Sequence, residues 1–226
     1  MTARGVKGVE RSWERLWEAL ARWKPGMTVD EWWEVEDPFF RCLGSVLVQR
    51  TTWHNAKKAI EGLKRRGLTN PFAVLQASEE ELIAAIRPAG FYRSKVPAIR
   101  QLCRFLPEAG KYAGKGSELR DRLLRIRGIG PETADTILLY VFNQPVFIGD
   151  AYAERIASRW FGKEYAKDRI REEVPFRFPD PGRLQLFHAL LVELGKRFCR
   201  KRVPRCPACP LRSTCHSAEE WRNPAD

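Results

Sequence analysis

Apolar side chains recur along almost the whole chain at the spacing of amphipathic helices. In the range 78–86, Ser78 and Glu81 have the spacing of a capping box, and three apolar residues that follow lie on one face. The same period predicts three further helices, over 94–106, 131–142 and 184–198. No alternating run is long enough to predict a sheet, and we therefore expect an all-α protein.

Two of these helices carry more specific expectations. Ser94 is placed to cap the helix 94–106, and Pro97 would then lie in its first turn, where a missing N–H is tolerated. The range 184–198 is apolar almost all round its axis, which predicts a central buried helix.

Composition narrows the class of protein. The chain has 226 residues and is 44% hydrophobic, so we expect a folded core rather than disorder. Lys and Arg number 40 against 28 Asp and Glu, a formal net charge of +12 that favours a polyanionic partner. On charge alone, DNA, RNA and membrane headgroups remain open. The sequence contains neither an apolar run of about 18 residues nor the apolar core of a secretion signal, and we expect a cytoplasmic protein.

The six cysteines are of two kinds. Cys42 and Cys103 stand alone in apolar surroundings and are expected to be buried thiols. The other four have the spacing Cys-x6-Cys-x2-Cys-x5-Cys, at Cys199, Cys206, Cys209 and Cys215. Four clustered thiolates can hold a [4Fe–4S] cluster or a tetrahedral zinc, whereas disulfides would need an oxidising compartment. The segment therefore predicts a metal centre.

A glycine turn interrupts the helical pattern at residues 123–136, LLRIRGIGPETADT. Gly128, Ile129 and Gly130 predict a tight turn, and Pro131 is suited to the first turn of the next helix. The unpaired N–H groups at that helix N-terminus form a natural seat for a phosphate. The pattern is that of a helix-hairpin-helix, with a plain pair of helices joined by a glycine turn as the alternative.

Asp150 follows Gly130 by twenty residues and comes directly before the predicted helix AERIASRWF. Taken alone, it is most simply a helix N-cap. In combination, the hairpin, Asp150 and the four-cysteine segment resemble the endonuclease III superfamily of DNA glycosylases, over about residues 29–215. The resemblance implies that Asp150 is the catalytic carboxylate, which stabilises positive charge on the deoxyribose as the N-glycosidic bond breaks.

The same resemblance implies the cofactor and the domains. The cysteine spacing matches the family's iron–sulfur loop, which favours [4Fe–4S] over zinc. Lys201 and Arg202 of this basic loop would contact DNA phosphates, the alternative being a solvated charge run. The implied subdomains are 29–145, with the hairpin at about 119–142, and 1–28 plus 146–226, with the cluster loop at 199–215.

Two further segments resemble segments of the family's proteins that insert side chains between the stacked bases of DNA. Residues 46–53, VLVQRTTW, resemble the helix whose Gln, here Gln49, fills the space of an extruded base. Residues 90–96, GFYRSKV, resemble the loop that supplies an apolar wedge, here Phe91. The alternatives are a capped polar core residue for Gln49 and a packed aromatic for Phe91.

Glu132 departs from the common family pattern, in which a Lys at this position forms an imine with the sugar and cuts the strand. A carboxylate cannot do so, and Lys95 is one amine that could substitute. The form GIG-x-E-[ST]-AD resembles the 3-methyladenine branch, whose members are monofunctional. That branch makes Glu132 an active-site residue, the alternative being a surface residue that suits the helix dipole.

Three tryptophans complete the expected site. Trp32, Trp33 and Trp53 resemble the aromatic residues that sandwich a flipped alkylpurine, although each could equally be a core residue. A cationic base would stack well against their faces. We expect a monomeric, monofunctional glycosylase acting on damaged double-stranded DNA, with no membrane partner and nucleoid-associated in a prokaryote. The alternatives are a uracil or thymine mismatch glycosylase and, from another class, a non-catalytic DNA-binding protein.

Overall fold

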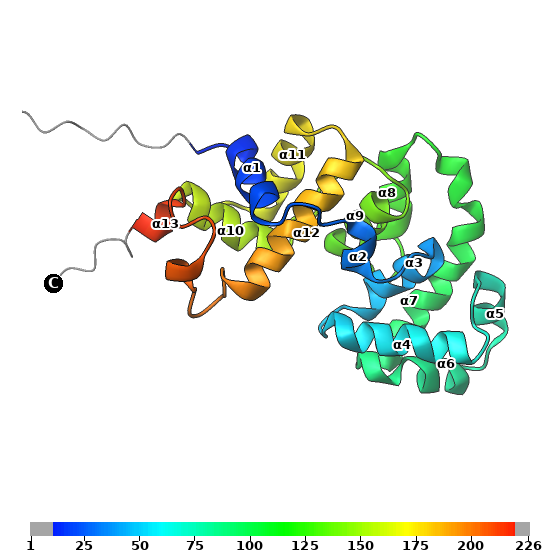
Figure 1. Cartoon of the computed structure of the whole chain (residues 1–226). Coiled ribbons are helices and arrows are strands. Elements are labelled where there is room, and N and C mark those ends of the chain that lie inside the picture. Colours follow the sequence, from blue (N-terminus) through cyan, green and yellow to red (C-terminus); the bar gives the residue numbers. More distant parts are fainter. Residues whose placement is uncertain (1–10, 220–226) are drawn as a thin grey trace, which may run out of the picture. The chain divides into compact units, whose positions relative to one another are not determined.

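The computed structural model describes residues 11–219, and this part of the chain is helical throughout (Figure 1). It contains thirteen α-helices and three short 3-10 helices, and no strand occurs within the described range. The expected all-α class is confirmed. None of the described helices is both long and apolar enough to cross a membrane.

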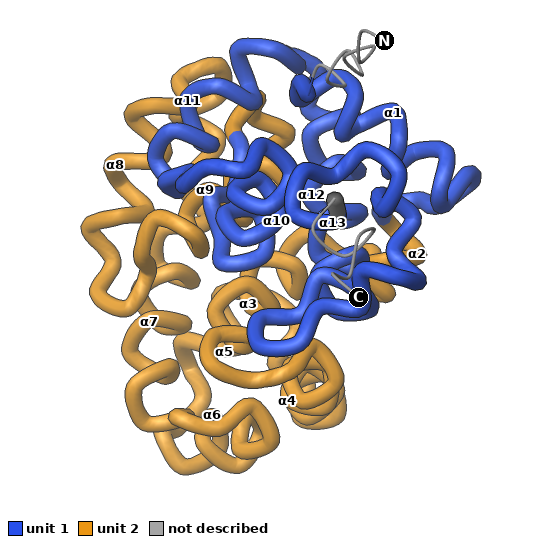
Figure 2. The backbone as a smooth tube through the Cα atoms, turned by 90° about the vertical axis from the view of Figure 1, so that its left-hand side faces the viewer, with its two compact units in different colours: residues 1–29, 147–226 blue, residues 30–146 orange. Residues whose placement is uncertain are grey.

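The chain forms two compact units, coloured separately in Figure 2. The inner unit is residues 30–146, and the terminal unit combines residues 1–29 with 147–226. The subdomains expected from the resemblance, 29–145 and the remainder, stay a prediction about which parts act as domains.

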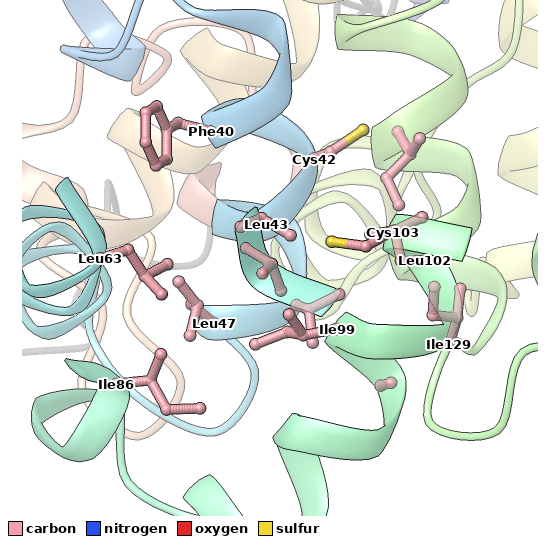
Figure 3. Packing of buried hydrophobic residues seen from close by; sticks show 14 of the residues in the cluster. Phe40, Cys42, Leu43, Leu47, Leu63, Ile86, Ile99, Leu102, Cys103 and Ile129 are labelled. Atoms are coloured by element: carbon pink, nitrogen blue, oxygen red, sulfur yellow. The ribbon is translucent and has the colours of Figure 1, made fainter. Parts of the chain in front are cut away.

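The inner unit is built around α3. Its helices are α2 (Val29–Trp33), α3 (Pro38–Leu47), α4 (Trp53–Arg65), α5 (Pro71–Gln76), α6 (Glu79–Ile86), α7 (Tyr92–Phe105), α8 (Gly116–Leu124) and α9 (Pro131–Tyr140), with 3-10 turns η1 (Arg87–Ala89) and η2 (Leu106–Tyr112). Helix α3 packs against α4, α7 and α9. Leu43 and Leu47 of α3 are fully buried beside Ile99 of α7, and the thiols Cys42 and Cys103 are buried as expected (Figure 3).

The start of α7 differs from the expectation. The helix begins at Tyr92, and its N-cap is Phe91 in the left-handed region, at φ 46°. Ser94 therefore lies inside the helix, where its hydroxyl donates to the Phe91 carbonyl oxygen. Pro97 is an interior residue rather than a first-turn one. The predictions for Ser94 and Pro97 were wrong because the chain turns at Gly90 (φ 65°), before the apolar stripe begins.

The terminal unit is organised around α12. Its helices are α1 (Trp13–Trp23), α10 (Ala151–Phe161), α11 (Lys167–Arg177), α12 (Pro181–Arg197) and α13 (His216–Glu219), with the 3-10 turn η3 (Cys206–Ala208). Helix α12 packs against α1 and α10. Phe187 of α12 is fully buried among the rings of Trp13, Phe147 and Phe178, which confirms the expectation of a buried helix here.

Candidate functional site

Asp150 is the N-cap of α10. Its Oδ1 accepts hydrogen bonds from the backbone N–H groups of Tyr152 (3.0 Å) and Ala153 (2.7 Å). The residue before it must be glycine, since a Cβ on Gly149 would lie 2.5 Å from the carbonyl oxygen of Lys167. The capping function read from the sequence is confirmed. It occupies one carboxylate oxygen and leaves Oδ2 for other partners.

His188 of α12 is the side chain that faces Oδ2, with Nε2 at 3.6 Å. This separation exceeds a hydrogen bond, so the interaction is electrostatic in the present geometry. Burial opposes ionisation of Asp150, but His188 and the two backbone N–H groups outweigh it and lower the pKa of the Asp150 carboxyl. The carboxylate is therefore charged at neutral pH. The sequence-based prediction did not include His188. A histidine within a helix that is apolar all round could have indicated a buried polar contact.

The glycine hairpin joins α8 to α9 within the inner unit. Gly128 has φ 96°, a left-handed conformation that favours glycine, while Ile129 is buried and anchors the turn in the core. The helix α9 begins at Pro131, as predicted. Its N-cap is Gly130, which has no side chain to accept the first N–H groups of the helix. The hairpin thus leaves the N-terminus of α9 without a side-chain cap, the arrangement that suits an anion.

Two residues of α9 have different surroundings. Glu132 is exposed in the first turn, as a surface residue would be. Asp135 is only 1% exposed, and its carboxylate accepts a hydrogen bond from Nε of Arg120 at 2.6 Å. This ion pair links α8 to α9. The Asp135 pair holds the shape of the hairpin, and Glu132 is the accessible carboxylate.

Gln49 lies in the turn after α3 rather than on a helix. Its Nε2 donates to the carbonyl oxygen of Gly128 (3.0 Å) and to Oγ1 of Thr133 (2.9 Å), so the side chain is docked on the hairpin. The next residue, Arg50, has φ 57°, and its guanidinium lies 5.7 Å from the ring centre of Phe91. Phe91 is 59% exposed, which excludes the packed-aromatic alternative.

Lys95 connects the segments that carry Gln49 and Phe91. Its side chain is 3% exposed, and Nζ donates to the carbonyl oxygens of Leu47 (2.8 Å) and Ala89 (2.9 Å). Leu47 is the last residue of α3 and lies two residues before Gln49. Ala89 is the last residue of η1 and lies two residues before Phe91. Burial lowers the pKa of Lys95 to about 8. An ammonium held by two carbonyls within the core is not placed to attack a sugar.

Replacing Lys95 with Met should lower the free energy of unfolding by about 2–6 kcal/mol, because two buried carbonyls lose their donor at about 1–3 kcal/mol each. Wild-type stability should also rise between pH 8 and 10.5, where the folded protein has released this proton and the unfolded chain has not. That rise should be absent from Lys95→Met. Urea unfolding at several pH values measures both effects. Lys58→Met on the exposed face of α4 is the control, and equal stability of the two variants would contradict the expectation.

The three tryptophans form one cluster in the inner unit, joined by Tyr140 of α9. Trp33 is 5% exposed and perpendicular to Trp53, with ring centres 4.9 Å apart. Trp32 meets Trp33 edge to face and stacks on Tyr140 at 5.8 Å. Trp53 rests on Gly44, where an added Cβ would come within 3.1 Å of its ring. The structure therefore brings the three together, but Trp33 and Trp53 are packed edge to face and not as a parallel slot.

Two indole N–H groups in this cluster stand out. Nε1 of Trp33 and Nε1 of Trp53 are buried and make no hydrogen bond. Buried polar atoms in proteins are paired in the great majority of cases, so two such donors side by side need an explanation. The sequence-based prediction considered only the faces of these tryptophan rings. It included neither their N–H donors nor Tyr140.

The four cysteines of the expected metal segment lie after α12 and around η3 and α13, and all are free, partly buried thiols. Arg159 of α10 holds the segment. Its Nη1 lies 3.3 Å from Sγ of Cys199 and donates to the carbonyl oxygen of Arg200 at 2.8 Å. Sγ of Cys215 donates in turn to the Arg159 carbonyl oxygen, at 3.4 Å. Lys201 and Arg202 are exposed on the same segment.

The four thiols would need a bound cation in order to lose their protons. Burial raises the pKa of Cys209 to about 12, and the neighbouring thiols add to the effect, so thiolates here need positive charge to balance them. Within residues 11–219, no three His, Cys, Asp or Glu side chains are grouped tightly enough for one metal ion. A single zinc would require all four sulfurs about 2.3 Å from one point. By its chemistry, a set of four thiols on one segment suits either a zinc ion or an iron–sulfur cluster.

Comparisons with known proteins identify the family. Residues 43–177 match the model of the HhH-GPD superfamily of base excision DNA repair proteins. A protein of Methanocaldococcus jannaschii named as a putative DNA repair glycosylase is 36% identical over 196 residues, 82% of this chain and 89% of its own. Endonuclease III of Thermotoga maritima is 30% identical over 184 residues, 79% of this chain and 83% of its own.

Solved structures share the fold. An endonuclease III in a non-covalent complex with DNA matches with TM-score 0.75 at 23% identity, over 92% of this chain and 96% of its own. The H. pylori 3-methyladenine DNA glycosylase bound to 1,N6-ethenoadenine gives 0.63 at 21%, over 81% and 96%. Relatives of several specificities match, so the narrower resemblance to the 3-methyladenine branch stays a prediction. The chain belongs to the HhH-GPD superfamily and is a DNA glycosylase of base excision repair.

Proposed function

We propose that the chain is a monofunctional glycosylase that hydrolyses the N-glycosidic bond of alkylated purines, 3-methyladenine foremost, in double-stranded DNA. The observation that carries the proposal is the Asp150 carboxylate, held ionised at a helix N-terminus with one oxygen outside the cap. As the base departs, positive charge grows on the deoxyribose. A fixed negative charge stabilises that state and helps to orient the attacking water.

The side chains at the two positions considered for a sugar-attacking amine support the monofunctional assignment. Glu132 stands where a Lys would form an imine, and its carboxylate has no such chemistry. Lys95, the amine considered as a substitute, is buried and bonded to two carbonyls. We assign Glu132 to the active site as an exposed carboxylate of the first turn of α9. The strand should therefore stay intact after the base is released.

The aromatic cluster supports a cationic purine as the substrate. An N3- or N7-alkylated purine carries positive charge, and its attraction to an indole face is worth about 1–2 kcal/mol when both are desolvated. The buried N–H groups of Trp33 and Trp53 would donate to acceptor atoms of a bound base. Because these rings now pack edge to face, entry of a base requires one of them to turn.

The remaining site residues are placed in the proposal as contacts to DNA. The turn Gly128-Ile129-Gly130 and the N-terminus of α9 would hold a backbone phosphate without reading sequence. Phe91 is exposed enough to act as a wedge between bases, and Gln49 would leave the hairpin to fill the gap. Lys201 and Arg202 would contact phosphates. The comparison structure of endonuclease III contains DNA, which agrees with this partner.

The four cysteines would hold a [4Fe–4S] cluster. Cys199, Cys206, Cys209 and Cys215 would each supply one thiolate. The cluster would cross-link residues 199–215 and keep the basic side chains of this segment in place. Arg159 would stabilise the negative charge on Cys199.

The proposal is tested with duplexes that each carry one lesion: an N3- or N7-methylpurine, uracil opposite guanine, or thymine opposite guanine. Single-turnover base release should be fast for the methylpurines alone. Trp53→Ala should lose about 1–3 kcal/mol of base recognition, the scale of base–aromatic stacking, and lose more for cationic than for neutral bases. Trp53→Phe, which keeps a ring, is the control. Excision of uracil or thymine with alkylpurines left in place would replace the proposal with the mismatch function.

A further inference from the structure

We infer that His188 is a positioning residue for the reaction, which holds the free oxygen of the Asp150 carboxylate in its working orientation. This inference rests on the proposed function in one respect, namely that Asp150 is the carboxylate of the reaction. It adds a residue from α12 that no element of the sequence pattern or family model assigns.

The two oxygens of Asp150 are treated differently by the fold. Oδ1 is held by two backbone N–H groups at 3.0 and 2.7 Å, and these hydrogen bonds fix the plane of the carboxylate only in part. Oδ2 has Nε2 of His188 at 3.6 Å. A shift of less than 1 Å would turn this contact into a hydrogen bond, and the imidazole would then limit rotation about the Cβ–Cγ bond.

The position of His188 suits a fixed role. The side chain is 6% exposed on α12, a helix that packs directly on α10, and its ring is edge to face with that of Phe147, with the ring centres 6.1 Å apart. A buried imidazole in an apolar helix destabilises the fold unless it has polar partners. Contact with a carboxylate is such a partnership, and burial beside Phe147 limits the freedom of the ring to turn away.

The charged groups nearby have other partners. Arg171 of α11 donates to the Gly149 carbonyl oxygen and pairs with Asp168. Arg155 of α10 donates to the carbonyl oxygens of Cys199 and Ala151. His188 is the ionisable side chain that contributes most to lowering the pKa of Asp150. Removing it should make the carboxylate both less ordered and easier to protonate.

The test compares His188→Phe with His188→Gln, whose amide keeps a donor near Oδ2. We expect His188→Phe to release base at least about 10-fold more slowly, the scale of a slightly misplaced catalytic group. The acid limb of its pH–rate profile should move to higher pH, because the carboxylate protonates more readily. His188→Gln should recover most of the rate at neutral pH. If the Phe variant does not fold, His188→Leu is used in its place.

Leu190→Ala, a buried change on the same helix, is the matched control. It should lower the melting temperature but leave the acid limb in place, whereas a merely structural His188 would behave in the same way as Leu190. An acid limb for His188→Phe that coincides with the wild-type one overturns the inference. Asp150→Asn separates the two claims: if it retains full activity, the carboxylate assignment fails, and if it is inactive while His188→Phe is normal, only this inference fails.

Discussion

Replacing Asp150 with Asn should reduce base release by roughly 10²- to 10³-fold while the protein stays folded and still binds lesion-containing DNA. The substitution removes the negative charge that stabilises the sugar cation. It preserves the cap, because Asn is as good an N-cap residue as Asp and its side-chain oxygen can accept the same N–H groups. Single-turnover base release and lesion-DNA affinity are measured side by side.

The capping role makes the choice of control important. Asp150→Ser should also keep the cap and lose the activity, whereas Asp150→Ala should lose both and be less stable by about 0.5–2 kcal/mol. If the Asn and Ser variants retain wild-type rates, Asp150 is a helix cap only. If activity follows the melting temperature across the three variants, the loss is one of structure and not of charge.

Replacing Cys206 with Ser should remove the cluster and unfold the segment 199–215 together. The regular structure of this segment is limited to the short 3-10 turn η3, and a metal centre built from the chain contributes its binding free energy to folding. Purified wild-type protein should be yellow-brown and contain about four irons. The variant should be colourless, with a lower melting temperature and weaker, less salt-dependent DNA binding through the loss of ordered Lys201 and Arg202.

The control is Cys103→Ala, which removes a thiol from the inner core. It should lose stability through the cavity it leaves while keeping its iron. Metal analysis that finds one zinc and no iron in the wild type would contradict the cluster. Full iron content in Cys206→Ser would remove this residue from the ligand set.

Local signals in the sequence predicted local structure well. The capping box at Ser78, the helix start at Pro131 and the cap at Asp150 each depend on residues within one turn, and the structure has all three. The predicted N-cap of α7, Ser94, lies three residues after the observed one, because Phe91 adopts a left-handed conformation that apolar periodicity does not report.

Contacts between distant segments could not be read in this way. His188 meets Asp150 across two helices, and Lys95 binds a carbonyl at Leu47. A lysine beside an apolar stripe is ordinarily exposed, so its burial depends on packing that only the fold supplies. The tryptophans were expected to meet, but their edge-to-face packing depends on Gly44, which leaves room for the ring of Trp53.

The central claim, base release without strand cleavage, is tested most directly by one reaction of the wild-type protein with DNA that contains 3-methyladenine. One portion is analysed for free base, a second for strand integrity before and after alkali, and a third is treated with borohydride. We predict free 3-methyladenine, strands that stay intact until alkali is added, and no protein–DNA adduct, because Glu132 offers no amine and Lys95 is buried. A borohydride-trapped adduct, or strands cut at neutral pH, would contradict the account.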